Sequence, residues 1–143
     1  MRLITLLIIH CSAVAPFQTS SVEQINEWHL AQGWKNGCGY HYVIRRDGSI
    51  EKGRPEEMIG AHCLHHNKHS IGVCYEGGID ANGKHTDTRT KAQKESMRTL
   101  LVELTERYPN ALIIGHNTFS SKDCPCFDAA KEYQDLQPKQ REK

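Results

Sequence analysis

The first chemical signal in this sequence is a histidine at the end of each of two short apolar segments. Residues 6–10 read LLIIH and residues 111–116 read ALIIGH, so His10 and His116 both follow runs typical of buried β-strands. In open α/β sheets, ligand sites gather at the carboxyl ends of the strands, where two such strands can bring both imidazoles to one edge. Cys124 follows His116 by eight residues, on a segment long enough to fold back over that edge. Two histidines and one cysteine, with a fourth position left for water, form a known arrangement of catalytic zinc.

The same residues also have simpler interpretations. A histidine at a strand end is often only the first polar residue outside the core, and Cys124 with Cys126, spaced C-x-C, could be half of a structural site or two inert thiols. The spacing of the other cysteines is irregular, and the chain is long enough to fold without cross-links. These other cysteines therefore read as small core residues: Cys11, Cys38, Cys63 and Cys74. Spacing alone leaves the metal site and its alternatives open.

Two helices are predicted from capping signals and apolar spacing. Ser20 and Glu23 match a capping box, so a helix is expected over residues 21–32. Thr90 and Gln93 match a second capping box, which opens a longer helix. The predicted apolar faces contain Val22, Ile25 and Trp28 in the first helix and Met97, Leu100, Leu101, Leu104 and Tyr108 in the second.

The strands and their order predict the fold class. Besides the two histidine-terminated runs, residues 39–53 read as a hairpin around an Asp-Gly turn, and residues 70–78 as a central strand. A short helix is expected near 128–135. The order β-α-β-β-β-α-β-α predicts a single α/β domain with a central mixed sheet flanked by helices. We expect this domain to span residues 1–136, followed by a C-terminal tail over 137–143.

Composition excludes several function classes. The chain has 143 residues and a net charge of +1, which fits one domain and gives no electrostatic footprint for nucleic acid. No apolar run approaches the roughly 18 residues that a spanning helix needs, so membrane insertion is not expected. Nine histidines favour metal or acid–base chemistry, although four of them fall within residues 61–69.

The apolar N-terminus could instead be a secretion signal. Met1-Arg2 followed by LITLLII meets the basic and apolar requirements at their lower limits. His10, however, places a bulky imidazole where a signal peptidase needs a small residue. The run is also short and β-branched, as expected of a fully buried strand. A strand is therefore the preferred interpretation.

Five fragments, taken in order, resemble the zinc-dependent N-acetylmuramoyl-L-alanine amidases. They are HCSA (10–13), QGWKNGCGYHYVIRRDGSIEKGRP (32–55), GAHCLHHNKHSIGVCYEGG (60–78), GH (115–116) and KDCPCFD (122–128). The resemblance is stronger to the small amidases that phages use as lysozymes, which are related in fold to the peptidoglycan recognition proteins. It runs from about residue 8 to residue 130, nearly the whole domain.

The resemblance implies a site and a reaction. It implies that His10, His116 and Cys124 bind zinc, and that Tyr40 and Lys122 assist catalysis. A signal-peptide cut beyond residue 11 would discard His10, so the N-terminal run should stay as the first strand. The bond implied as the substrate is the amide between the lactyl group of N-acetylmuramic acid and L-alanine in peptidoglycan, whose cleavage lyses the cell wall.

The resemblance also implies a substrate groove and a place of action. A histidine after Gly-x and an asparagine before Ser-Ile-Gly-Val fall on His62 and Asn67, which would line the groove. We expect a monomer that is made in the cytoplasm without a signal peptide. It would reach the cell wall after release by a separate pore-forming protein.

Each implied residue has a chemical reason. Zinc lowers the pKa of a bound water toward about 7, which supplies a nucleophile at neutral pH. Lys122 would meet the negative charge that develops on the carbonyl oxygen, an effect of about 3–4 kcal/mol on the barrier. Tyr40 is a poor base near pH 7 unless its pKa is lowered, so an orienting role is expected.

Other functions remain as alternatives. The main one is a non-catalytic peptidoglycan-binding module of the same fold, but such relatives typically lack the zinc cysteine. An intracellular regulatory protein and a redox protein using Cys124 and Cys126 are weaker alternatives. The chain has no basic arm to support the first, and the second predicts thiol behaviour insensitive to zinc.

Overall fold

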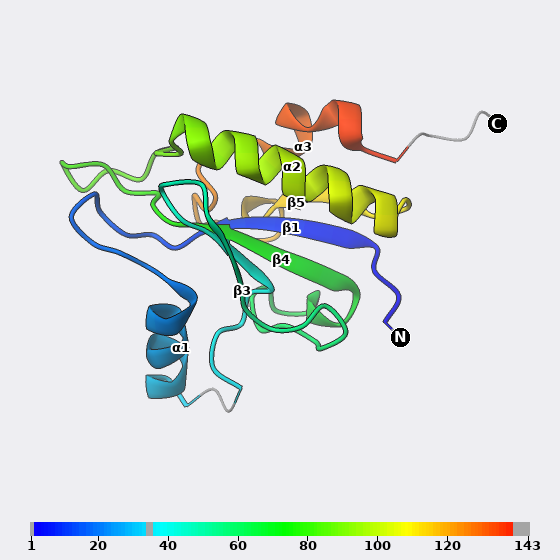
Figure 1. Ribbon diagram of the computed structural model, residues 1–143, viewed down its shortest axis with the longest axis horizontal. Coiled ribbons are helices and arrows are strands. Elements are labelled where there is room, and N and C mark those ends of the chain that lie inside the picture. The colour runs from blue at the N-terminus through cyan, green and yellow to red at the C-terminus, as the bar shows by residue number, and fades with distance from the viewer. Residues whose placement is uncertain (1, 34–35, 139–143) are drawn as a thin grey trace.

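Five strands form one mixed sheet in the computed structural model, which describes residues 2–33 and 36–138 (Figure 1). The strands lie in the order β3-β2-β4-β1-β5, and only β3 runs antiparallel to its neighbour. This confirms the predicted α/β class with a mixed sheet. The bounds are β1 Leu6–Cys11, β2 Tyr42–Ile44, β3 Ile50–Lys52, β4 Ser70–Tyr75 and β5 Leu112–Gly115.

The central strand β1 explains the unbroken apolar run at the N-terminus. It pairs in parallel with β4 on one side and with β5 on the other, and both of its faces are covered. A strand buried on both faces needs no polar alternation. Leu7 and Ile9 join the core cluster that includes the apolar face of α2 (Lys91–Arg107), whereas Ile8 belongs to a cluster on the opposite face. Because side chains alternate along a strand, His10 projects from the same face as Ile8.

Helix α2 covers one face of the sheet. Thr90 caps it and exchanges hydrogen bonds with Gln93, as the capping-box prediction requires. The short helix α3 (Ala129–Glu132) lies on the same side of the sheet (Figure 1). The buried face of α2 consists of Gln93, Met97, Leu100, Leu101 and Leu104, which confirms four of the five residues of the predicted apolar stripe. The fifth, Tyr108, is the C-cap of the helix and is only partly buried against the core.

Helix α1 (Val22–Ala31) packs on the opposite face, where Ile25 contacts the cluster that contains Val43 and Cys74. The predicted capping box at Ser20 was wrong by one residue. Ser21 is the N-cap, and Gln24 supplies the reciprocal hydrogen bond. Ser20 is fully buried instead, and its backbone N–H donates to Glu76 Oε2 at 2.6 Å.

Trp28, predicted on the apolar face of this helix, is 41% exposed. Ile25 is the buried residue of α1, so the apolar face of this helix is narrower than the spacing of Val22, Ile25 and Trp28 predicted.

The described residues also include three short helical turns, η1 Asn67–His69, η2 His116–Thr118 and η3 Gln134–Leu136. Gln137, the first residue of the predicted tail, exchanges hydrogen bonds with the backbone of Ile113 in β5. The tail residues 139–143 lie outside the described residues, and the domain boundary at 136 stays a prediction.

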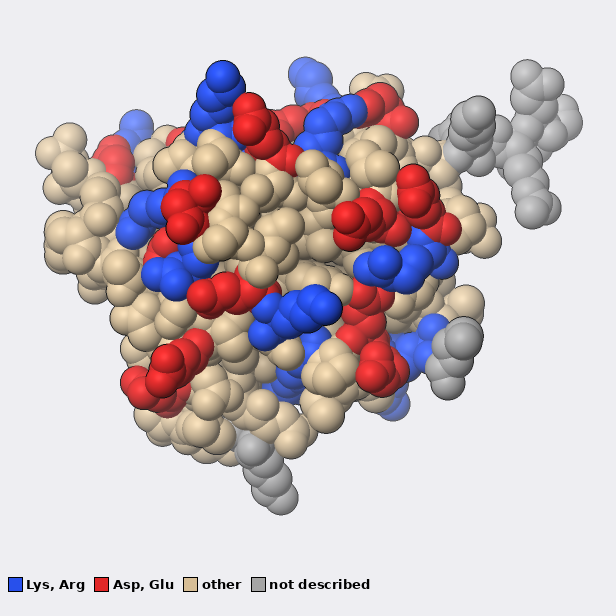
Figure 2. Space-filling view, viewed as in Figure 1, with Lys and Arg blue, Asp and Glu red and all other residues tan. Residues whose placement is uncertain are grey.

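The surface carries mixed charge. On the face shown in Figure 2, basic and acidic side chains are interspersed and form no single-sign patch. Among the described residues, none of the helices combines the length and the apolar character needed to cross a membrane.

Candidate metal centre and active site

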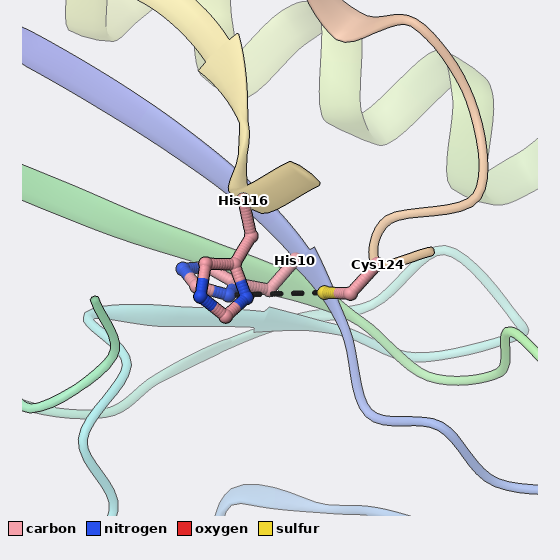
Figure 3. A group of neighbouring side chains, drawn as sticks. All are labelled: His10, His116 and Cys124. Carbon is pink, nitrogen blue, oxygen red and sulfur yellow. Dashed lines mark hydrogen bonds between the residues drawn. The ribbon is translucent and has the colours of Figure 1, made fainter. Parts of the chain in front are cut away.

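The structure brings together the three residues singled out by their chemistry. Strands β1 and β5 are neighbours with Ile9 opposite Gly115, so their carboxyl ends place His10 and His116 side by side. The ring centroids of the two histidines are 4.6 Å apart. Cys124 approaches from the loop after η2, and its Sγ lies 3.9 Å from His10 Nδ1 (Figure 3). The convergence follows from strand order, which the sequence pattern allowed but did not specify.

The three donor atoms fit a zinc ion. One ligand atom from each residue lies within 4.8 Å of the others. Zinc bonds of about 2.1 Å to nitrogen and 2.3 Å to sulfur place tetrahedral ligands about 3.4–3.6 Å apart, so a movement of about 1 Å closes the site. Three protein ligands of this kind leave one coordination position for water or substrate, as catalytic zinc sites do.

The electrostatic surroundings keep both imidazoles neutral, which metal binding requires. Burial lowers the pKa of His10 well below its usual value, and the neighbouring His62 and His116 lower it further. Burial also lowers the pKa of His116, and the positive charge of Lys122 adds to this effect. Both shifts favour the neutral form of the imidazole, which is the form that binds a metal ion.

The backbone of β1 also contacts the sulfur. The Cys11 N–H donates to Cys124 Sγ at 3.1 Å. A hydrogen bond with Cys124, together with burial, raises the pKa of the Cys11 thiol, so Cys11 stays protonated beside the candidate ligand. Cys11 was predicted as a small core residue, and its side chain does join the core cluster on the α2 side of the sheet. Its backbone N–H and its thiol nevertheless both contact Cys124.

A cavity of about 580 Å³ opens over these residues. Tyr40 and Lys122, the predicted catalytic residues, both line it, and so do the predicted groove residues His62 and Asn67. The structure thus brings all seven predicted site residues to one place; their roles stay predictions.

Tyr40 lies against the first histidine, with its ring centroid 5.1 Å from that of His10. Burial raises the pKa of its phenol well above the usual value, and the thiols around it act in the same direction. A phenol with a raised pKa stays protonated at neutral pH and donates a hydrogen bond rather than accepting a proton. This supports the orienting role over that of a base.

Lys122 is exposed at the rim of the cavity. It also lines a second, polar cavity of about 600 Å³ with Asn117 and Asp128, so the two cavities are adjacent. Its flexible side chain can bring a positive charge toward a bound carbonyl without first being desolvated.

His62 and Asn67 are engaged with protein atoms at the cavity wall. His62 is 9% exposed, and its Nδ1 lies 2.8 Å from His10 Nε2. Asn67 Oδ1 accepts hydrogen bonds from the backbone N–H groups of His62 and Cys63 at 2.9 and 3.0 Å. These contacts connect the loop that carries His62 and Asn67 to the candidate metal ligand His10.

Another buried histidine, His41, was not predicted and belongs to the core. Its Nδ1 accepts from the Gly72 N–H at 3.0 Å, and its Nε2 donates to the Met58 carbonyl at 2.8 Å. Burial lowers its pKa to about 4. Since both ring nitrogens are satisfied by backbone groups, His41 is a neutral structural residue.

The chain is similar to known proteins over most of its length. The sequence profile of the N-acetylmuramoyl-L-alanine amidase family matches residues 1–127. The chain is 45% identical to the endolysin of Escherichia phage T7 over 122 residues, which cover 85% of this chain and 80% of that protein.

Solved structures show the same fold. The N-acetylmuramoyl-L-alanine amidase LysC from Clostridium intestinale superposes with a TM-score of 0.77 at 27% identity, over 92% of this chain and 83% of that one. A point mutant of Drosophila PGRP-LB, solved in complex with tracheal cytotoxin, superposes with a TM-score of 0.78 at 22% identity, over 99% of this chain and 86% of that one. With a family match over most of its length and a candidate metal centre at the mouth of a cavity, this chain belongs to the N-acetylmuramoyl-L-alanine amidase family.

Proposed function

We propose that this peptidoglycan-cleaving amidase uses a zinc ion held by His10, His116 and Cys124. The bond cleaved joins the lactyl group of N-acetylmuramic acid to L-alanine of the stem peptide. The observation that carries the proposal is the convergence of three suitable donor atoms at the cavity. When bound, zinc supplies Lewis acidity, by which water becomes a nucleophile at neutral pH and a carbonyl is polarised.

The protein's own groups would do the rest of the work. Tyr40, held protonated by burial, would donate a hydrogen bond that orients the attacking water or the scissile carbonyl. The Lys122 ammonium would approach the carbonyl oxygen from the rim, where negative charge develops as the carbon becomes tetrahedral. His10 and His116 would each offer a lone pair of a neutral imidazole to the metal, and this role needs no proton transfer during the reaction.

The test is hydrolysis of purified cell walls, followed by the release of new amino termini. We expect release with zinc, loss of release with a chelator, and recovery when zinc is restored. His10→Ala, His116→Ala and Cys124→Ala should each lose metal and activity together. Walls that are bound but not cleaved in zinc-replete buffer would instead establish a binding module.

Two finer expectations accompany this proposal. Action as a monomer is tested by sedimentation with and without a soluble muropeptide. Release to the wall by a separate pore-forming protein is tested by expressing the chain in cells with and without a membrane-permeabilising protein, with lysis expected only when both are present.

A further inference from the structure

The nitrogen of His10 that does not face the sulfur has a specific partner. His10 Nδ1 is directed at Cys124 Sγ, at 3.9 Å, while His10 Nε2 lies 2.8 Å from His62 Nδ1. The two rings meet edge to face, with an interplanar angle of 89°. His62 Nε2 in turn lies 3.2 Å from the hydroxyl of Ser70, which is fully buried at the start of β4. The contacts form a chain from the candidate metal centre through two imidazoles to a buried hydroxyl.

Metal binding would decide where the protons in this chain lie. A ligating imidazole must offer a lone pair, so with Nδ1 toward the metal the His10 proton sits on Nε2. At 2.8 Å this N–H has to donate to His62 Nδ1, which places the His62 proton on Nε2, facing Ser70 Oγ. The opposite arrangement would put a proton on His10 Nδ1 and abolish the lone pair.

The protein provides a fitted space for the His62 ring. A Cβ atom added to Gly72 would lie 2.6 Å from the ring, and one added to Gly60 would lie 2.7 Å from it. Real side-chain atoms do not approach so closely, so only glycine at these two positions admits the imidazole. Asn67 fixes the backbone of His62 from the other side through its amide oxygen. The orientation of the ring is therefore determined by packing as well as by hydrogen bonds.

We infer that His62 is a positioning residue for the metal ligand His10, and that Asn67 and Ser70 hold His62 in place. The inference rests on the proposed zinc site and assigns His62 and Asn67 to ligand orientation rather than to direct contact with the muropeptide. Ligating histidines usually donate their second N–H to a carboxylate, a carbonyl or water. A neutral imidazole as acceptor adds no negative charge, so a zinc ion with one thiolate keeps a net charge of about +1.

The positioning role of His62 can be tested by zinc affinity, measured by competition with a chromogenic chelator, without using the enzymatic reaction. His62→Ala removes the acceptor and should weaken zinc binding about 10- to 100-fold, the usual effect of losing such a partner. His62→Asn retains an acceptor oxygen near the Nδ1 position and should bind within about threefold of wild type. His69→Ala is the matched control, since it removes an imidazole from the same loop that does not line the cavity.

Spectroscopy supplies a second readout. In cobalt-substituted protein, the visible absorption of His62→Ala should differ from wild type because His10 is free to rotate, and His62→Asn should restore the wild-type spectrum. In the zinc-loaded wild type, long-range ¹H–¹⁵N correlations should show His10 and His62 both protonated at Nε2. Should His62→Ala not fold, this tautomer measurement and the one-atom deletion Ser70→Ala, expected to weaken zinc binding several-fold, decide the question.

The outcomes separate this inference from the proposed function. If the wild-type protein bound no zinc, the proposed function itself would be wrong, because its cofactor would be absent. Wild type that binds zinc and cleaves walls, with unchanged affinity in His62→Ala or with His62 protonated at Nδ1, would overturn the positioning role alone. If His62→Ala raised KM without weakening zinc binding, His62 would be a substrate-binding residue, and the positioning role would be wrong.

Discussion

Arg89 is a buried cation that joins the C-terminal segment around α3 to the start of α2. Its replacement by methionine tests how much these contacts stabilise the packing of α3 and α2 on the sheet. Its guanidinium forms paired hydrogen bonds with Asp87 at 2.9 Å and with Glu132 at 2.8 Å. It also donates to Tyr133 Oη at 3.0 Å and lies 3.5 Å above the Phe127 ring. Arg89→Met keeps the apolar stem and removes only the charged group.

The magnitude follows from the exposure of each partner. Tyr133 is 2% exposed, so its hydroxyl loses a partner that water cannot easily replace, at about 1–3 kcal/mol. The side chains of Asp87 and Glu132 are 25% and 40% exposed, so water replaces much of what they lose, leaving up to about 1 kcal/mol each. We expect a loss of about 3 kcal/mol in the free energy of unfolding, which corresponds to a Tm lower by about 9 °C.

Urea unfolding at pH 7 measures this loss, with EDTA present in every sample so that metal binding does not enter the difference. The matched control is Arg98→Ala, which breaks an ion pair with Asp135 whose side chains are 48% and 58% exposed. Exposed pairs of this kind contribute at most about 1 kcal/mol. Equal losses for the two variants, or a loss below about 1 kcal/mol for Arg89→Met, would refute the reasoning.

The pH dependence gives an independent check. Hydrogen bonds from Arg89 lower the pKa of Glu132, and they lower that of Asp87 despite its partial burial, which acts in the opposite direction. A carboxyl group with a lowered pKa in the folded state stabilises it above its unfolded pKa, about 3.9 for Asp and 4.3 for Glu. That stability is lost as the pH falls through the lower, folded values. The deficit of Arg89→Met should therefore be constant from pH 5 to pH 8 and shrink below about pH 4. A deficit that stayed the same at pH 3 would show that packing, rather than charge, causes it.

Three further predictions concern the site and its supports. Lys122→Ala should lower kcat on cell walls by about 10²- to 10³-fold while the zinc content, measured by elemental analysis, stays at the wild-type level; loss of zinc from this variant would contradict the assignment. Glu76→Gln should cost about 2 kcal/mol in urea unfolding, because the two carboxylate oxygens of Glu76 accept from the backbone N–H groups of Ser20 and Arg46, whereas an amide has one acceptor oxygen and would turn its NH₂ toward the other N–H; an unchanged midpoint would show that these contacts are dispensable. Zinc at about 1,000 times its Kd should stabilise the wild type by about 4 kcal/mol and raise its Tm by about 12 °C, and it should leave Cys124→Ala unchanged; a rise in the variant would place the metal elsewhere.

Local patterns in the sequence were sufficient to predict most of the elements. The apolar runs before His10 and His116 became adjacent central strands, since a segment without polar alternation can only be stable when both faces are covered. Thr90 and Gln93 capped α2 as expected, because a capping box involves residues three apart and needs no tertiary context. The Asp-Gly turn likewise joined β2 and β3.

Packing, which the local sequence does not record, decided which serine caps α1. Ser20 was predicted as the N-cap, but Ser21 takes that place because Ser20 is buried, with its N–H donating to Glu76. Trp28 has the right spacing for the apolar face of α1, yet the sheet offers it no surface, and it is exposed.

The sequence by itself determined which residues could bind a metal: two histidines at strand ends and a cysteine within reach of them. The tertiary structure alone decided that these residues meet, because the strand order places β1 beside β5 and the loop after η2 returns over their ends. It also decided the surroundings of His62, whose contact with His10 depends on the space left by Gly60 and Gly72. The contact joins residues that are 52 positions apart in the sequence, and it is possible only because glycines leave space for the His62 ring. No local sequence pattern predicts such a contact.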